Sequence, residues 1–160
     1  MDKAGIVNEI IKELERQRSE LETGLASARQ AAMESPGAMQ SHSDTTKSQM
    51  HTLASNIEKL IKEKTSAINA LKNNPASEGS SKKIGIGTLV ETEGENGRKI
   101  FYLIAPEGGA GAVIERGNEK ITSITPGTPL GSALLEKRIG DTAVLKNRTG
   151  DRNLKILNIY

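Results

Sequence analysis

Few residues of this 160-residue chain could do chemistry, because the sequence contains no cysteine and only two histidines. The missing cysteines exclude a disulfide framework, a thiolate zinc site and a cysteine nucleophile. Carboxylates are the main remaining candidates, and Glu34 and Asp44 flank the segment Ser35-Pro36-Gly37, which is expected to interrupt a helix. Carboxylate oxygens are ligands that suit Mg²⁺. The two side chains could converge across a turn, although their spacing alone does not show it.

The polar residues around this segment also have simpler interpretations. Asp44 precedes residues 45–47 in the position of an N-cap, whose carboxylate would accept a hydrogen bond from the first helical N–H groups. Glu34 would then be an exposed residue of a last helical turn. His42 is a loop residue, or else a proton carrier or a phosphate contact. Both the chemical and the structural hypotheses for Asp44 and Glu34 stay open at this point.

Glycine and aromatic residues divide the chain into two halves. Residues 1–75 contain three of the 16 glycines and no aromatic residue, whereas residues 76–160 contain the other glycines and Phe101, Tyr102 and Tyr160. Glycine is unfavourable inside helices and useful in turns. The first half is therefore predicted to be helical, and the second to consist of strands and turns. The hydrophobic content of 35 % argues against one large core.

Heptad-spaced apolar residues predict two long helices in the first half. The two stripes are Val7, Ile11, Leu14, Arg18, Leu21, Leu25 and Ala28, and Met50, Leu53, Ile57, Leu60, Lys64, Ala67 and Leu71. A narrow stripe must be buried against another stripe, and two matched stretches around one breaker favour an antiparallel hairpin at residues 1–75 over pairing with a second chain. We expect this seam to need no other core. The methionines Met33, Met39 and Met50 are expected to pack its end.

The second half is predicted to form a small β-rich domain. Residues 76–83 are polar and serine-rich, which indicates a linker, and residues 84–160 contain short β-like segments separated by turn signals such as Asn96-Gly97. Thr128 and Pro129 form a strong helix start, as N-cap and first helical residue, for a short helix over residues 129–137. The predicted fold class is α+β, with an N-terminal antiparallel helical hairpin (coiled coil) followed by a small β-rich domain with one short helix.

The charge balance is nearly even, with 22 basic and 20 acidic residues. The largest local excess lies in residues 137–160, where six basic residues stand against Asp141 and Asp151. This surface is either a solvated face or a weakly attractive surface for a polyanion. The sequence has no run of 18 apolar residues and no apolar leader, so we expect no membrane contact and a cytoplasmic location.

The segment over residues 124–135, Ile-Thr-Pro-Gly-Thr-Pro-Leu-Gly-Ser-Ala-Leu-Leu, is followed by Lys137, Gly140-Asp141 and an ending over residues 156–160 with the sequence Ile-Leu-Asn-Ile-Tyr. This order resembles the C-terminal domain of bacterial Gre-type transcription elongation factors, which has a Ser/Thr-Pro element, a short helix, Gly-Asp and an ending of Ile-x-x-Ile-x-Tyr type. The ending here is one residue shorter. That family also places an antiparallel coiled coil before an FKBP-like C-terminal domain, so the resemblance covers nearly the whole chain, with residues 84–160 as the FKBP-like part.

The resemblance implies a protein that binds RNA polymerase and is not itself an enzyme. In that family the C-terminal domain grips the rim of the polymerase secondary channel. The residues here that match this grip are Thr125, Pro126, Gly127, Thr128, Pro129 and Leu130. The hairpin enters the channel, where acidic residues at its tip help the polymerase to hold Mg²⁺ and to cleave a backtracked transcript near its RNA 3′ end. The chain alone would then bind no cofactor or metal, and a monomer is expected.

The tip departs from the cleavage-competent pattern of the family, which is an Asp-x-x-Glu element. Asp44 matches the first carboxylate, but Lys47 occupies the second position, where a cation would repel Mg²⁺. One hypothesis is a factor that stimulates transcript cleavage through Asp44, with Glu34, and a second is a polymerase-channel regulator or inhibitor without cleavage. A third, an FKBP-like isomerase or chaperone, is disfavoured because three aromatic residues can hardly line an isomerase pocket.

Overall fold

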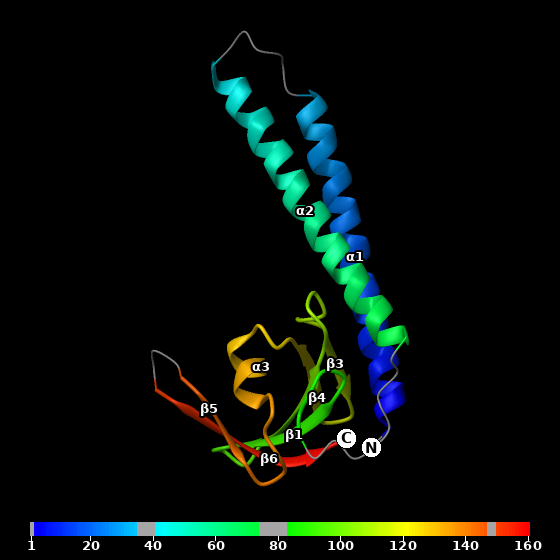
Figure 1. Ribbon diagram of the computed structural model, residues 1–160. Helices are drawn as coiled ribbons and strands as arrows, with labels where there is room; N and C mark the ends of the chain where they lie inside the picture. Colours follow the sequence, from blue (N-terminus) through cyan, green and yellow to red (C-terminus); the bar gives the residue numbers. More distant parts are fainter. Residues whose placement is uncertain (1, 35–40, 74–82, 147–149) are drawn as a thin grey trace.

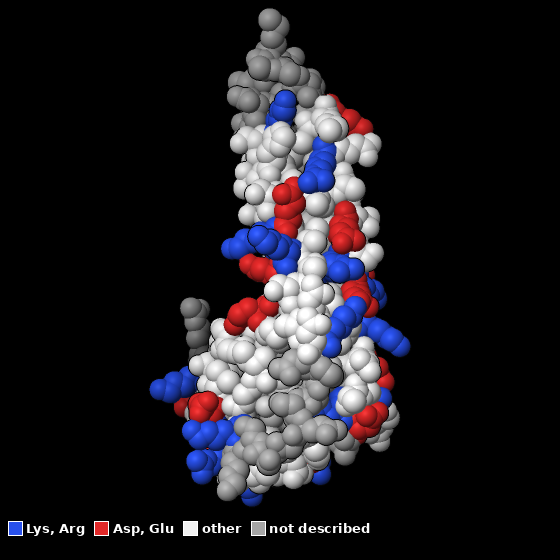
Figure 2. All heavy atoms as spheres, turned by 45° about the vertical axis from the view of Figure 1, so that its right-hand side comes forward, with Lys and Arg blue, Asp and Glu red and all other residues white. Residues whose placement is uncertain are grey.

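The structure is a computed structural model that describes residues 2–34, 41–73, 83–146 and 150–160, with the backbone alone for residues 41–46. Two long helices, α1 (Lys3–Glu34) and α2 (Ser41–Asn73), lie side by side and antiparallel, and together they form an arm that rises from a small sheet (Figure 1). Acidic and basic side chains are interspersed along the face of the arm in Figure 2. The predicted breaker at residues 35–37 and almost all of the predicted linker at residues 76–83 lie outside the described residues.

The second half forms one six-stranded sheet with a short helix. Its elements are β1 (Leu89–Gly94), β2 (Lys99–Ile104), β3 (Val113–Arg116), β4 (Glu119–Ile124), α3 (Pro129–Leu134), β5 (Thr142–Leu145) and β6 (Arg152–Ile159). The strand order is β3-β4-β2-β1-β6-β5, and every neighbouring pair is antiparallel except β2 and β4. The predicted fold class of a helical hairpin followed by a small β-rich domain with one short helix is confirmed. α3 ends before residue 137, because Glu136 adopts a left-handed φ of 61°.

The apolar seam of α1 is the one that the sequence predicts. Val7, Ile11, Leu14 and Ala28 are buried, and the side chains between them along the stripe are half-buried. Mostly apolar residues at these spacings keep one face of a helix out of water.

The seam of α2 matches the prediction except at Leu53 and Leu60. Leu53 and Leu60 are 45 % and 48 % exposed, whereas Ala54 and Ile68 are buried. The stripe that is buried or half-buried consists of Met50, Ala54, Ile57, Ile61, Lys64, Ala67, Ile68 and Leu71. The predicted packing of Met33 is also wrong, since its side chain is 86 % exposed. Met39 lies outside the described residues.

The base of the hairpin shares one core with the sheet, contrary to the expectation that the seam needs no other core. Ile10 and Leu14 of α1 and Ile68 of α2 belong to the same buried cluster as Phe101 and Leu103 of β2. The arm is too narrow to bury these large side chains between two helices alone, so they pack onto one face of the sheet instead. The hairpin and the β-rich domain are therefore joined by a common hydrophobic core.

A loop between β2 and β3 passes close to α2. Gly108 has a φ of +85°, and a Cβ at this position would collide with the backbone carbonyl of Glu63. Gln17 of α1 donates a hydrogen bond from Nε2 to the carbonyl of Gly111 at 3.1 Å. At the end of β3, Arg116 donates from two of its nitrogens to Glu9 Oε1 of α1, at 3.0 and 2.8 Å. These contacts fix the hairpin at both ends of β3.

The opposite face of the sheet is covered by α3. Leu134 of α3 packs with Val90, Ile104 and Ile156 in a second buried cluster, and Leu130 is half-buried against it. The sheet thus lies between the base of the hairpin on one face and a single short helix on the other (Figure 1).

A buried carboxylate of β1 lies on the hairpin-facing side of the sheet. Glu91 is 4 % exposed, and its oxygens lie 2.8 Å from Lys99 Nζ, Asn158 Nδ2 and Tyr160 Oη. The pKa of Glu91 is held at about 2, first by the hydrogen bond from Lys99 and then by those from Asn158 and Tyr160. This network ties β6 to β1 and β2.

Candidate functional site

The turn before α3 is set by the N-cap that the sequence predicts. Thr128 has an extended φ and ψ of −81° and 149°, and its Oγ1 accepts a hydrogen bond from the N–H of Gly131 at 3.1 Å. The same hydroxyl donates to the carbonyl of Thr125 at 2.8 Å. Pro129 is the first helical residue, where its missing N–H costs nothing. The turn is therefore preorganised by its own side chains.

Two further contacts hold this turn in place. A Cβ at Gly131 would overlap the carbonyl of Thr125, so only glycine allows the first turn of α3 to sit against the preceding strand end. Glu107, in the loop after β2, accepts a hydrogen bond from the N–H of Gly127 at 3.1 Å. The loop that contacts the arm and the turn before α3 are thereby connected.

The six residues expected to bind the polymerase come together in this turn but differ in exposure. Gly127 and Pro129 are exposed, and Pro126, Thr128 and Leu130 are half-buried. Thr125 is only 4 % exposed and supports the turn from beneath. The surface that a partner could touch is therefore formed by residues 126–130.

At the end of the arm, the two candidate carboxylates lie on different helices. Glu34 is the last residue of α1, is exposed, and accepts a hydrogen bond from Gln30 Nε2 at 2.8 Å. The helix α2 begins at Ser41, so Asp44 lies within its first turns and is not the N-cap, and His42 is helical and not a loop residue. The side chain of Asp44 lies outside what the structure describes, and so does its separation from Glu34.

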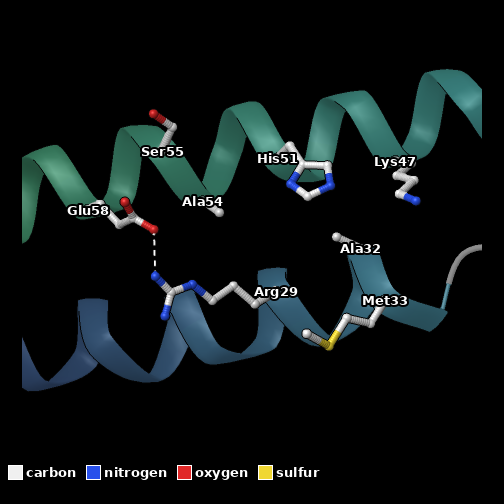
Figure 3. A pocket seen from close by; sticks show the side chains of 8 residues that line it. All are labelled: Arg29, Ala32, Met33, Lys47, His51, Ala54, Ser55 and Glu58. Atoms are coloured by element: carbon white, nitrogen blue, oxygen red, sulfur yellow. Dashed lines mark hydrogen bonds and ion pairs between the residues drawn. The ribbon is translucent and has the colours of Figure 1, made fainter.

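A cavity of about 450 Å³ opens between α1 and α2 near this end (Figure 3). Arg29 Nη2 of α1 lies 2.7 Å from Glu58 Oε1 of α2, and Lys47 and His51 line the side nearer the end of the arm. Small side chains of both helices form part of the wall, including Ala32. The cavity exists because alanines in this part of the seam cannot fill the space between two helices.

Sequence reasoning missed the Arg29–Glu58 pair, although a signal was present. Arg29 follows the seam residue Ala28, and Glu58 follows the seam residue Ile57. Residues that flank a coiled-coil seam on facing helices commonly form ion pairs. The prediction from the sequence considered only the seam itself.

A polar layer interrupts the seam where the arm meets the β-rich domain. Lys64 donates a hydrogen bond from Nζ to Gln17 Oε1 at 3.0 Å, and Gln17 Nε2 donates to Glu13 Oε1 at 2.9 Å. Burial lowers the pKa of Lys64, while the charge of Glu13 opposes this shift. The cation is thus bound within the hairpin at the level of Gly111.

Within the described ranges, no group of three histidine, aspartate or glutamate side chains is placed to hold a metal ion. A search of the described helices for a stretch long and apolar enough to cross a membrane also finds none.

A comparison with known protein families gives a match for the second half of the chain. Residues 79–160, just over half of the sequence, match the family model described as the C-terminal domain of transcription elongation factor GreA/GreB. The chain belongs to the GreA/GreB family of transcription elongation factors. The matched region of this Gre-family chain contains the whole sheet, α3 and the turn at residues 126–130, and the helices α1 and α2 lie before it.

Solved structures similar to this Gre-family chain include the GreA factor homolog 1 (Gfh1) of Thermus thermophilus, at 23 % identity and a TM-score of 0.41, with 94 % of both chains covered. Gfh1 of Thermus aquaticus has 25 % identity and a TM-score of 0.42, covering all of this chain and 96 % of that one. TM-scores of this size carry no argument about function, so the family assignment stands on residues 79–160. No curated protein sequence matches the chain.

Proposed function

We propose that this Gre-family chain binds RNA polymerase as a monomer in the cytoplasm and acts through the secondary channel, where it modulates cleavage of backtracked transcripts. The family match over residues 79–160 is the observation that carries the proposal. The arm supports it, because α1 has 32 residues and at about 1.5 Å per residue extends about 48 Å. A narrow arm with a firm base suits insertion into a channel.

The turn at residues 126–130 is the proposed grip on the polymerase. Its backbone is fixed by Thr128 and Gly131, so binding would cost little conformational entropy. The variant Pro129→Glu keeps a favourable first-turn residue in α3 and places a charge on the exposed surface. In a pull-down with core polymerase, we expect this variant to lose binding.

Lys155→Glu is the matched control for charge, because Lys155 is exposed on β6 and far from α3 in sequence. It should bind as the wild type does. Equal binding of wild type, Pro129→Glu and Lys155→Glu would contradict the proposed grip.

The end of the arm does not fit a magnesium-binding carboxylate pair as well as the family pattern requires. Lys47 is exposed and lines the same cavity as Arg29, and Glu58, the one carboxylate among the lining residues, lies beside Arg29 at the end away from Lys47. Two cations beside a single carboxylate disfavour a bound divalent cation. This observation favours a second candidate function, a polymerase-channel regulator that does not stimulate cleavage.

A cleavage assay on backtracked elongation complexes separates the two candidates. If the chain stimulates cleavage through Asp44, the variant Asp44→Asn should abolish the stimulation. If it is a non-cleaving regulator, the wild type should give no stimulation, and Lys47→Glu, which completes the Asp-x-x-Glu element, should introduce it. The control is Lys59→Glu, farther along α2 and also exposed. Failure of the wild type to bind polymerase at all would contradict both candidates.

The chain is proposed to be a protein cofactor of the polymerase and not an enzyme in its own right. The isomerase alternative needs an aromatic pocket beside the short helix, but Phe101 is buried beneath the hairpin and Tyr160 is hydrogen-bonded to Glu91. Tyr102 is then the one aromatic residue left for the face that α3 covers. Measurable proline-isomerase turnover on a model peptide would overturn this view.

A further inference from the structure

The helix α3 covers only part of its face of the sheet, and a groove lies on the remainder. A cavity of about 660 Å³ runs over the starts of β2 and β4, and a second of about 350 Å³ runs over the ends of β1 and the start of β6. Ile100 lines both cavities, so the two adjoin each other across the strands. We call this feature the sheet groove.

The alternation of side chains along the strands decides which groups face the sheet groove. Ile121 of β4 lies in the core beneath the hairpin, so its neighbours Lys120 and Thr122 point to the α3 side. In β2, Phe101 lies beneath the hairpin, and Ile100 and Tyr102 therefore point into the groove.

Two other charged residues, Lys99 and Glu119, also line the larger cavity. Lys99 forms its ion pair with Glu91 on the hairpin-facing side, and the charge of Glu119 acts on Lys99 and Tyr160 there. Their opposite charges cancel, so the two residues leave the net charge of the groove unchanged.

Three cations border the sheet groove. Arg98 and Lys120 are exposed beside its larger cavity, and Arg152 is exposed beside the smaller one. Within the described residues, no carboxylate forms an ion pair with any of the three. The nearby Glu95 accepts hydrogen bonds from the backbone and side chain of Asn153. The groove therefore presents a net positive charge.

An aromatic ring lines the larger cavity together with Arg98 and Lys120. Tyr102 is half-buried against the core under α3, and it also lines the groove. Burial raises the pKa of Tyr102, and the positive charge of Arg152 opposes the shift, so the guanidinium acts on the ring from the neighbouring cavity. The polar side chains Asn118 and Thr122 stand in the same cavity as the ring.

We propose that the sheet groove binds a short segment of single-stranded RNA, with a base stacked on Tyr102 and backbone phosphates held by Arg98, Lys120 and Arg152. An aromatic ring on an open sheet face with cations at its border is the arrangement that single-stranded nucleic acids require. Two adjoining cavities along the strands suit a chain of nucleotides better than one compact ligand. The amide of Asn118 and the hydroxyl of Thr122 can hydrogen-bond the ribose 2′-hydroxyl, which favours RNA over DNA.

This site is separate from the turn at residues 126–130 and from the end of the arm. The groove lies at the starts of β2 and β4, whereas the turn follows the end of β4 and packs against the loop after β2. The proposal does not rest on polymerase binding, and RNA binding can be measured with the isolated chain.

The test is fluorescence anisotropy of the full chain with a labelled single-stranded RNA of about ten nucleotides at low and moderate salt. The triple variant Arg98→Gln, Lys120→Gln, Arg152→Gln should weaken binding at least about ten-fold and reduce its salt dependence, because each phosphate contact releases counterions. The matched control is Lys155→Gln, because Lys155 lies on the same strand as Arg152 but on the opposite face.

Tyr102 is tested by a pair of variants. Tyr102→Leu keeps an apolar side chain against the core and removes the stacking surface, so binding should fall about ten-fold. Tyr102→Phe keeps the ring and should bind as the wild type does. The melting temperature of each variant, measured alongside, shows that the chain remains folded.

Four outcomes would overturn the proposal. The first is that the wild type binds no RNA, and the second is that the triple variant binds RNA with unchanged affinity. The third is that the wild type binds a DNA strand of the same sequence equally well. The fourth is that a polyglutamate peptide displaces the RNA while Tyr102→Leu binds RNA normally. The last result would assign the groove to an acidic protein segment.

Discussion

The two ends of the hairpin differ in how they are built. At its base, large side chains such as Leu14 and Ile68 are fully buried against the sheet, and the polar contacts reach the β-rich domain. Near its other end, the seam contains Ala28, Ala32 and Ala54, and a cavity separates the helices. The comparison indicates that the base carries the stability of the fold, whereas the end is free to carry function.

The largest expected effect is at the base. Phe101→Ala should lower the free energy of unfolding by about 4 kcal/mol, because it opens a cavity in the core shared by hairpin and sheet. Urea unfolding followed by helical and by aromatic signals should show one transition at a lower midpoint. Met33→Ala, at the exposed end of α1, is the control and should leave the midpoint unchanged. Two separate transitions in the wild type would contradict a common core.

Glycine substitutions sharpen the comparison. Gly108→Ala should lower the free energy of unfolding by about 2 kcal/mol, because alanine is strained at a φ of +85° and its Cβ meets the carbonyl of Glu63. Gly24 lies inside α1 with open space around it, so Gly24→Ala should raise the same quantity by about 1 kcal/mol. Thermal unfolding of both variants gives the measurement, and shifts of the same sign would contradict the contact between loop and arm.

The pH dependence of the free energy of unfolding tests the hydrogen bonds of Glu91, the buried carboxylate on the hairpin-facing side of the sheet. The pKa of Glu91 is about 2 in the folded chain and is close to 4.5 when unfolded, so its stabilisation is present above pH 4.5 and is lost as the pH falls toward 2. Glu91→Gln should cost about 2 kcal/mol at pH 7 and much less at pH 2.5. If the difference in the free energy of unfolding between the wild type and Glu91→Gln does not become smaller in acid, the proposed hydrogen-bond network of Glu91 is contradicted.

The smallest effect is expected at the end of the arm. Both partners of the Arg29–Glu58 pair are about half exposed, so solvent and salt screen their attraction. Glu58→Gln should leave the melting temperature nearly unchanged in about 0.15 M salt, which is an ordinary buffer concentration. A large drop would show that the end contributes to stability as the base does, and the contrast between the two ends would be lost.

The sequence predicts the elements better than it predicts their contacts. The α1 stripe follows from residue spacing alone, and the N-cap Thr128 follows from a local motif. In α2 two stripes share Met50 and Leu71, and spacing cannot choose between the set with Leu60 and the set with Ile68. The choice is made by the sheet, since Ile68 packs in the cluster that contains Phe101.

The candidate sites also differ in how far the sequence predicts them. The turn at residues 126–130 is continuous in sequence, so a motif locates it, whereas the sheet groove is assembled from β1, β2, β4 and β6 and has no local signature. The interpretation of Asp44 as an N-cap was wrong because α2 begins at Ser41, four residues before the helix start that the motif suggests. Helix ends are where local propensity is least decisive.

The central claim is that a hairpin fixed at its base delivers its free end into RNA polymerase. A photo-crosslinking residue placed at Met33, which is 86 % exposed, tests this most directly, with the exposed base position Lys12 as the control. In backtracked elongation complexes, the account predicts crosslinks from position 33 to polymerase residues lining the secondary channel and to the RNA 3′ end, and none of these from position 12. The absence of such crosslinks from position 33, or equal yields from both positions, would contradict it.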